Sequence, residues 1–94
     1  MKSILQNERV CFVCGSPYVE EHHIFPGVGN RKKSEELGLK VYLCHEHHQG
    51  NTGAHKNKIL RERLQKYAQI KFEETHTHEQ WMKLFRKNYL GDMK

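Results

Sequence analysis

The chain has 94 residues, of which 36% are hydrophobic, and its 16 Lys and Arg against 11 Asp and Glu give a formal net charge of +5. This length allows one domain, residues 1–94, with a modest core, and no apolar run approaches the roughly 18 residues that a membrane span needs. The positive balance favours a polyanionic partner such as nucleic acid, although many small soluble proteins are equally basic.

The N-terminal segment indicates a reducing compartment. Residues 1–10 lack the basic start and apolar run of a secretory signal, so we expect a cytoplasmic location. The three cysteines are an odd number, which excludes a complete disulfide framework. In a reducing cytosol, the Cys-x-x-Cys of residues 11–14 more often binds a metal than forms a disulfide. Gly15 then supplies a turn position.

The next part of the chain predicts two short strands and the turns around them. Residues 18–25 carry apolar side chains and are bounded by two prolines, which is typical of a strand. Residues 26–38 hold three glycines and a basic triplet, and they predict a long loop with one helical turn at residues 34–37. Residues 39–43 predict the second strand, and the glycines of 50–53 predict a turn.

Two amphipathic helices are predicted in the C-terminal half. Residues 54–72 place apolar side chains on one stripe and basic side chains on the other faces. Thr77 and Gln80 have the spacing of a capping box. The second helix, which carries Trp81, is expected to end near Gly91 and to pack its apolar side chains on the core.

Two spaced pairs of ligands predict a structural zinc site. A Cys-x-x-Cys turn can aim both thiolates at one point, and Cys44-x-x-His47 can do the same from the end of the second strand. We therefore assign Cys11, Cys14, Cys44 and His47 to one closed site. Two alternatives are a free cysteine beside a redox dithiol, and His45 in place of His47. His45 adjoins Cys44 and would have difficulty reaching the same ion.

Four further histidines predict an open metal site beside a histidine base. His22 and His23 are neighbours, and neighbours on a strand point to opposite faces, so a pair with one role each is easier near a strand end, where the chain twists out of regular geometry. His48 follows the second ligand pair, and His55 lies at the expected start of the long helix, where the potential favours phosphate. A neutral imidazole can take a proton from water near pH 7. The alternative for the pair is two ordinary histidines at a strand end.

Other polar residues near these clusters have weaker assignments. Solvent or capping roles are expected for His45, His76 and His78. We expect Glu20, Glu21 and Glu46 either to contact the site histidines or to form a solvated face.

The run CxxC … EEHHIFPG … VYLCHEHHQG … GAH, over about residues 11–56, resembles the HNH endonucleases, part of the ββα-metal (His-Me finger) nucleases. The spelling LCHEHHQGNTGAH resembles small phage-type members with an added zinc knot. The resemblance implies an α+β fold with a zinc-bound ββα-metal unit over residues 11–56, and the predicted helices form a helical extension over residues 57–94 that is not part of the general motif. The resemblance implies metal-dependent hydrolysis of DNA phosphodiester bonds, in the host cytoplasm if a phage encodes the chain. Low sequence specificity is expected because no DNA-reading module is visible in the sequence.

By position in this resemblance, His23 matches the general base, while His22 and His48 match metal ligands. His55 matches the third position less closely and would complete the metal site or hold the scissile phosphate. The implied cofactors are a structural Zn²⁺ and a catalytic Mg²⁺, Mn²⁺, Ni²⁺ or Zn²⁺. The family's middle Asn, which positions the base, is absent before the second ligand pair. Asn30, Asn51 or a backbone carbonyl is expected to replace it.

Basic side chains in the loop and at the helix start are expected to contact phosphates, unless they form solvated surface. They are Arg31, Lys32, Lys33, Lys56 and Lys58. RNA is a second candidate substrate for the same site. A double-strand break would need a second copy of the chain or a phage packaging or recombination partner. The alternative function is a non-catalytic zinc-binding module that binds nucleic acid or a protein partner.

Overall fold

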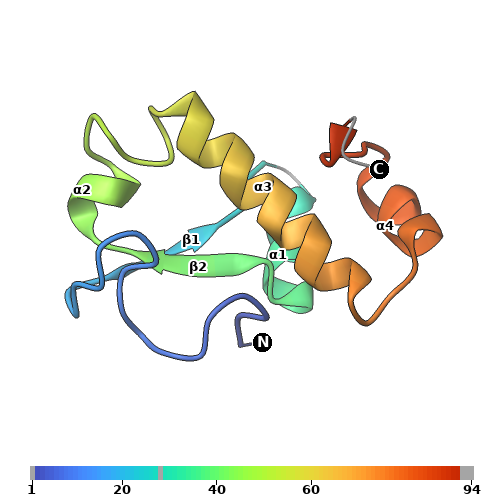
Figure 1. Ribbon diagram of the computed structural model, residues 1–94, viewed down its shortest axis with the longest axis horizontal. Helices are drawn as coiled ribbons and strands as arrows, with labels where there is room; N and C mark the ends of the chain where they lie inside the picture. Colours follow the sequence, from blue (N-terminus) through green and yellow to red (C-terminus); the bar gives the residue numbers. More distant parts are fainter. Residues whose placement is uncertain (1, 28, 92–94) are drawn as a thin grey trace.

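The computed structural model describes residues 2–27 and 29–91, which contain an antiparallel two-stranded sheet and four helices (Figure 1). The elements in chain order are β1 (Glu20–His23), α1 (Asn30–Leu37), β2 (Lys40–Leu43), α2 (His45–His48), α3 (Lys58–Glu73) and α4 (His78–Phe85). The predicted α+β class is confirmed. Among the described residues, no helix combines the length and apolar character that crossing a membrane would require.

The register of the sheet separates the two neighbouring histidines of β1. His22 pairs with Val41 and His23 pairs with Lys40. Directly opposed residues share a face of the sheet, and successive residues alternate between faces. His22 therefore lies on the face of Val41, which is buried, while His23 lies on the opposite face with Lys40.

The hydrophobic core joins the inner face of the sheet to α3 and α4. Val41 and Leu43 of β2 belong to the same buried cluster as the side chains of α3. Trp81 of α4 is fully buried, and its ring centroid lies 5.5 Å from that of Phe25 and 4.4 Å from that of Phe85. The predicted packing of the second amphipathic helix on the core is confirmed. The buried members from α3 are Leu64, Ala68 and Phe72.

The segment between the strands differs from the prediction. Residues 26–38 were expected to form a loop with one helical turn, but Asn30–Leu37 form the eight-residue helix α1. The helix ends at Gly38, which adopts the left-handed conformation with φ 72°. Glycine tolerates this conformation, and its place after the run Ser-Glu-Glu-Leu is a helix-end pattern that the loop prediction overlooked. The strand before it is also shorter, Glu20–His23 instead of 18–25.

The boundaries of the C-terminal helices also need correction. The long helix begins at Lys58, not at residue 54, because the side chain of Asn57 accepts the backbone N–H of Leu60 at 3.1 Å and caps it. The capping box of Thr77 is confirmed. The last helix ends at Phe85 and not near Gly91.

Candidate metal centres and the histidine beside them

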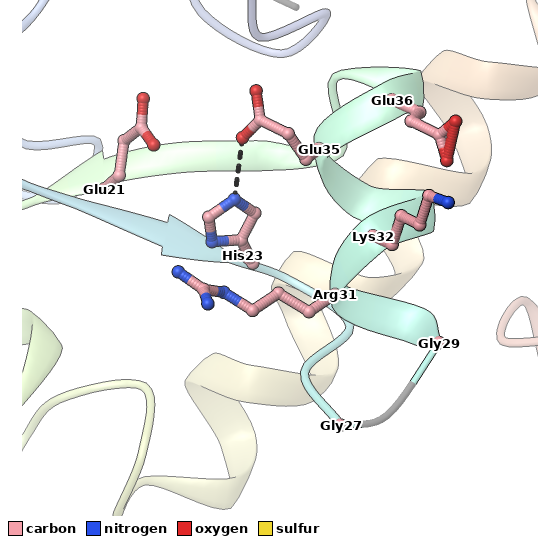
Figure 2. A pocket seen from close by; sticks show the side chains of 8 residues that line it. All are labelled: Glu21, His23, Gly27, Gly29, Arg31, Lys32, Glu35 and Glu36. Carbon is pink, nitrogen blue, oxygen red and sulfur yellow. Dashed lines mark hydrogen bonds and ion pairs between the residues drawn. The ribbon is translucent and has the colours of Figure 1, made fainter.

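His23 lies on the outer face of the sheet and is paired with a carboxylate from α1. Its Nε2 lies 2.8 Å from Oε1 of Glu35 (Figure 2). Glu35 also accepts two hydrogen bonds from Nζ of Lys40, at 3.0 and 3.1 Å, and Lys40 donates to Glu21 at 3.2 Å. Hydrogen bonds first from His23 and then from Lys40 lower the pKa of Glu35 to about 2, so this carboxylate is ionised at neutral pH.

An open hollow of about 550 Å³ lies in front of His23 and Glu35. Arg31 and Lys32, at the start of α1, line the same hollow and are exposed. Lys33 instead turns towards α4, where its Nζ donates to the backbone oxygen of Leu84 at 2.5 Å. Two of the three predicted phosphate contacts in this segment thus face the His23 hollow. Lys56 and Lys58 are exposed in and after the turn that precedes α3.

A second group of imidazoles converges on the inner side of the sheet, and we call it the histidine triad: His22, His48 and His55. One nitrogen from each lies within 4.8 Å of the others. Nε2 of His48 and Nε2 of His55 are 3.1 Å apart, and the ring centroid of His22 lies 5.2 and 5.1 Å from theirs. Two ring nitrogens that face each other at this distance can bind one cation between them. The triad can therefore hold a metal ion.

The surroundings of His22 and His55 favour the neutral forms of these two rings. Burial, and then the neighbouring His48, His55 and His23, lower the pKa of His22 to about 3. The pKa of His55 is also lowered, first by burial and then by His48 and Arg61. A neutral imidazole is the form that binds a metal ion.

Glu20 fixes the proton of His48. Its Oε1 lies 2.7 Å from Nδ1 of His48, and hydrogen bonds first from His48 and then from His45 lower the pKa of Glu20. An ionised carboxylate only accepts, so Nδ1 of His48 carries the proton and Nε2 presents its lone pair to the triad.

His55 reaches the triad through a tight turn and not from a helix start. Backbone N–H groups of Ala54 and His55 donate to the carbonyls of His47 and His48, at 2.8 and 3.4 Å, and fold the turn back over α2. A Cβ on Gly53 would meet the carbonyl carbon of His48 at 2.8 Å, so this close approach requires glycine. The predicted placement of His55 at the N-terminus of the long helix, with its favourable potential for phosphate, is wrong because α3 begins at Lys58.

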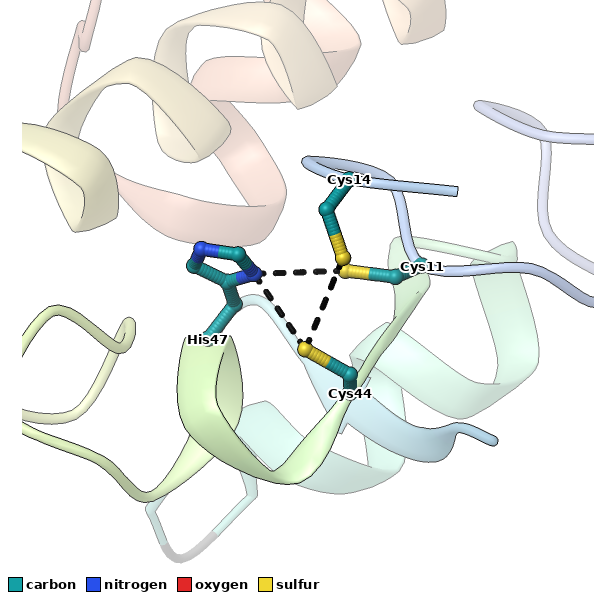
Figure 3. A group of neighbouring side chains, drawn as sticks. All are labelled: Cys11, Cys14, Cys44 and His47. Carbon is teal, nitrogen blue, oxygen red and sulfur yellow. Dashed lines mark hydrogen bonds between the residues drawn. The ribbon is translucent and has the colours of Figure 1, made fainter. Parts of the chain in front are cut away.

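Three thiols and one imidazole form a separate group, the Cys3His cluster (Figure 3), made up of Cys11, Cys14, Cys44 and His47. Nδ1 of His47 lies 3.2 Å from Sγ of Cys44 and 3.6 Å from Sγ of Cys11, while Cys14 and Cys44 have their sulfurs 3.7 Å apart. A tetrahedral zinc ion with bonds of about 2.3 Å would separate two sulfurs by about 3.8 Å. The spacing of these donors fits a tetrahedral metal ion.

The pKa values of the cysteine thiols in the cluster also favour the binding of a cation. Burial raises the pKa of Cys11, but hydrogen bonds from the backbone of Cys44, Cys14 and Val13 and from His47 outweigh it and bring the value to about 6. The pKa of Cys14 is raised in spite of a backbone hydrogen bond at Ser16, because the Cys11 and Cys44 sulfurs lie beside it. Several thiolates cannot crowd together without positive charge, and a bound metal ion supplies that charge.

The short helix α2 divides its histidines among three directions. Successive residues of a helix are turned by roughly 100°. His47 points into the Cys3His cluster and His48 into the triad, while the side chain of His45 is 77% exposed. The choice of His47 over His45 as the fourth member of the cluster agrees with this arrangement.

No protein-family model, curated protein or solved structure matches this chain. What the sites can do is therefore inferred from their own geometry. The eight residues assigned to the two metal sites and to the base fall into three local groups, namely the Cys3His cluster, the triad and the pair of His23 with Glu35.

Two acidic residues of the site were not predicted with defined roles. Glu35 was not considered, since residues 26–38 were expected to be mainly a loop. Glu20 was only one of three glutamates near the site. A partial signal existed for Glu20, because it precedes His22 by two residues and must share its face of the strand. Asn30, Asn51 or a backbone carbonyl was expected to position His23, but the structure places the carboxylate of Glu35 against Nε2 of its ring.

Proposed function

We propose that this chain is a metal-dependent endonuclease of the HNH type that hydrolyses phosphodiester bonds in DNA. The observation that carries the proposal is the convergence of His22, His48 and His55, from three separate segments, on one point, with His23 following His22 along β1 on the opposite face of the sheet. A structural role alone does not account for the buried His22, because burying its ring without charge costs stability at acidic pH.

The triad would hold the catalytic ion. All three ligands are imidazoles, a donor set that favours nickel or zinc over magnesium. When bound, the ion would supply positive charge to the phosphorane and to the departing 3′ oxygen. Glu20 keeps Nε2 of His48 free of a proton for this purpose.

His23 would be the general base. Its side chain is 12% exposed and opens onto the hollow that Arg31 and Lys32 line, so water and a phosphate can approach it. A neutral imidazole takes a proton from water near pH 7 and thereby generates the nucleophile. The basic side chains would hold the DNA backbone without reading its sequence.

The Cys3His cluster would hold a structural zinc ion. Its four donors come from the N-terminal turn and from the junction of β2 with α2, so one ion would tie these segments together. In a chain of 94 residues such a constraint supplements a small core. Since His47 and His48 are neighbours, the structural ion would also fix the position of one catalytic ligand.

A second candidate function is a zinc-binding module without catalysis that binds nucleic acid or a protein. One observation favours it: the hollow in front of His23 is lined by residues of β1 and α1 and by the loop between them, and not by the triad, which lies on the other face of the sheet. A phosphate would have to reach around the end of β1 to contact both groups.

Plasmid nicking distinguishes the two candidates. The wild-type chain is assayed with Mg²⁺, Mn²⁺, Ni²⁺ and Zn²⁺, beside His23→Ala and, as a control, His76→Ala, whose ring stacks on Phe72 away from both sites. We expect cleavage that falls at least ~100-fold in His23→Ala, which is the usual contribution of a general base, and no change in the control. Absence of cleavage with every metal, on DNA and on RNA, would favour the non-catalytic module.

A further inference from the structure

Outside the two candidate metal sites, a hydrogen-bonded polar network ends on His23. Lys40 is almost fully buried, with the residue 6% exposed, and its Nζ contacts both Glu21 and Glu35 at 3.0 to 3.2 Å. Glu35 in turn contacts Nε2 of His23. Glu21, His23 and Glu35 have the spacing of a metal site. The ammonium of Lys40 already lies between the two carboxylates, so the cation of this group is Lys40 itself.

This network determines which nitrogen of His23 carries the proton. A carboxylate that is ionised has only acceptor atoms, so the 2.8 Å contact requires that Nε2 of His23 is the donor. In the neutral ring the lone pair is then on Nδ1. Figure 2 shows Nε2 facing Glu35 and the other ring nitrogen pointing away from it. The base nitrogen of His23 is therefore Nδ1.

We propose that Glu35, held in place by Lys40, is the positioning residue of His23 and fixes both its ring orientation and its tautomer. This inference rests on the proposed function, in which His23 is the base. In the reaction, Nδ1 takes a proton from water, the water oxygen bonds to phosphorus, the bond from phosphorus to the 3′ oxygen breaks, and the 3′ oxygen is protonated by solvent. The imidazolium formed at His23 then lies against the anionic Glu35, which stabilises it, as a carboxylate does in other carboxylate–histidine pairs.

Lys40 gives Glu35 a single position. A glutamate on the surface of a helix samples several rotamers, but two hydrogen bonds to a buried ammonium restrict it. The strand register places Lys40 opposite His23, so the sheet holds Lys40 close to the proposed base. The carboxylate of α1 thus takes the positioning role that was expected of Asn30, Asn51 or a backbone carbonyl.

The test compares Glu35→Ala with Glu36→Ala in the full-length chain. Glu36 lies next to Glu35 on α1 and lines the same hollow, and its side chain is exposed, so it is a matched control. Two quantities are measured: the kcat and KM of DNA cleavage, and the tautomer of His23 from long-range nitrogen–proton NMR spectra. The His23 signals are assigned by their absence in His23→Ala, and urea unfolding checks that each variant is folded.

We expect wild type and Glu36→Ala to show His23 protonated at Nε2. In Glu35→Ala the Nδ1–H tautomer should appear and KM should stay the same. The kcat should fall by about 10- to 100-fold, by analogy with the loss of residues that orient metal-bound histidines. Equal kcat and equal tautomers in the two alanine variants would overturn the inference while the endonuclease function stands. An Nδ1–H tautomer in wild type would overturn it as well.

A wild-type chain that cleaves nothing would overturn the proposed function and, with it, the catalytic role of Glu35. The NMR measurement still separates the two failures, since it reads the pairing of His23 with Glu35 without any need for activity.

Discussion

Glu20 of β1 and His48 of α2 are hydrogen-bonded, with Oε1 of Glu20 2.7 Å from Nδ1 of His48. The contact links the strand that carries His22 to the helix that carries His48, and so it holds two members of the triad in one geometry. Nε2 is then the only ring nitrogen of His48 that offers a lone pair.

Replacing Glu20 with Ala should therefore weaken the binding of a divalent ion to the triad. Loss of such a support typically costs about 10- to 100-fold in metal affinity. Calorimetric titration with Ni²⁺, on protein whose Cys3His cluster is already filled, measures this dissociation constant. Glu62→Ala, which removes an exposed carboxylate of α3, is the control and should bind as wild type does. An unchanged affinity in Glu20→Ala would mean that the contact does not serve the triad.

The buried His22 should make the free energy of unfolding depend on pH. In the unfolded chain its pKa is near the ordinary 6.5, whereas in the folded chain it is about 3. Between these values the unfolded state binds more protons, so stability is lost as the pH falls from about 6.5 towards 3, by up to about 1.4 kcal/mol per pH unit from this group. Urea unfolding at pH 7, 6 and 5, without added catalytic metal, should show a shallower pH dependence in His22→Gln than in wild type. Parallel curves would contradict the buried, neutral state.

Local sequence patterns predicted the parts of this molecule that depend on neighbours in the chain. The Cys-x-x-Cys turn and Cys44-x-x-His47 each set their own geometry, and the four donors do lie together. The capping box at Thr77 and the glycine turn before His55 are local in the same sense. The identity of an ion in the cluster remains a prediction that the metal-content experiments below address.

Features that depend on tertiary placement were missed. The pair of His23 with Glu35 exists only because α1 is a helix and because the register sets His23 opposite Lys40. The register is not encoded within a short window, whereas the end of α1 at Gly38 was a local pattern that was overlooked. The start of α3 is a local feature too, because the cap of Asn57 outweighs the apolar period that continues back to residue 54. The two adjacent histidines were expected near a strand end, out of regular geometry, but the regular register places His22 and His23 on opposite faces of the sheet.

His47 and His45 offer a direct test of the Cys3His cluster, because they lie on the same short helix and differ in direction. His47→Ala should lose the tightly bound ion and a large part of the folded stability, since the cluster keeps only three donors. His45→Ala, whose side chain is mostly exposed, should retain both. Metal content after gel filtration and thermal unfolding measure the two effects. Loss of the ion in His45→Ala alone would reverse the assignment.

Arg31 and Lys32 should contribute to DNA affinity through phosphates. Single alanine variants should weaken binding equally for unrelated sequences, and each should reduce the slope of log K against log salt by about 1. Fluorescence anisotropy across a salt series measures this slope. Lys71→Ala is the control, since Lys71 pairs with Glu74 on α3. A slope unchanged in Arg31→Ala and Lys32→Ala would place the DNA on another face.

The most direct test of two separate metal sites is to measure the number of bound ions per chain together with plasmid nicking. Mild chelation should remove the ion of the triad and abolish nicking, while one zinc ion per chain remains and the chain stays folded. Nicking should then return when Ni²⁺ or Mn²⁺ is added, but not in His48→Ala. Nicking that persists with a single zinc ion per chain, or that is equal in His48→Ala and wild type, would contradict the account.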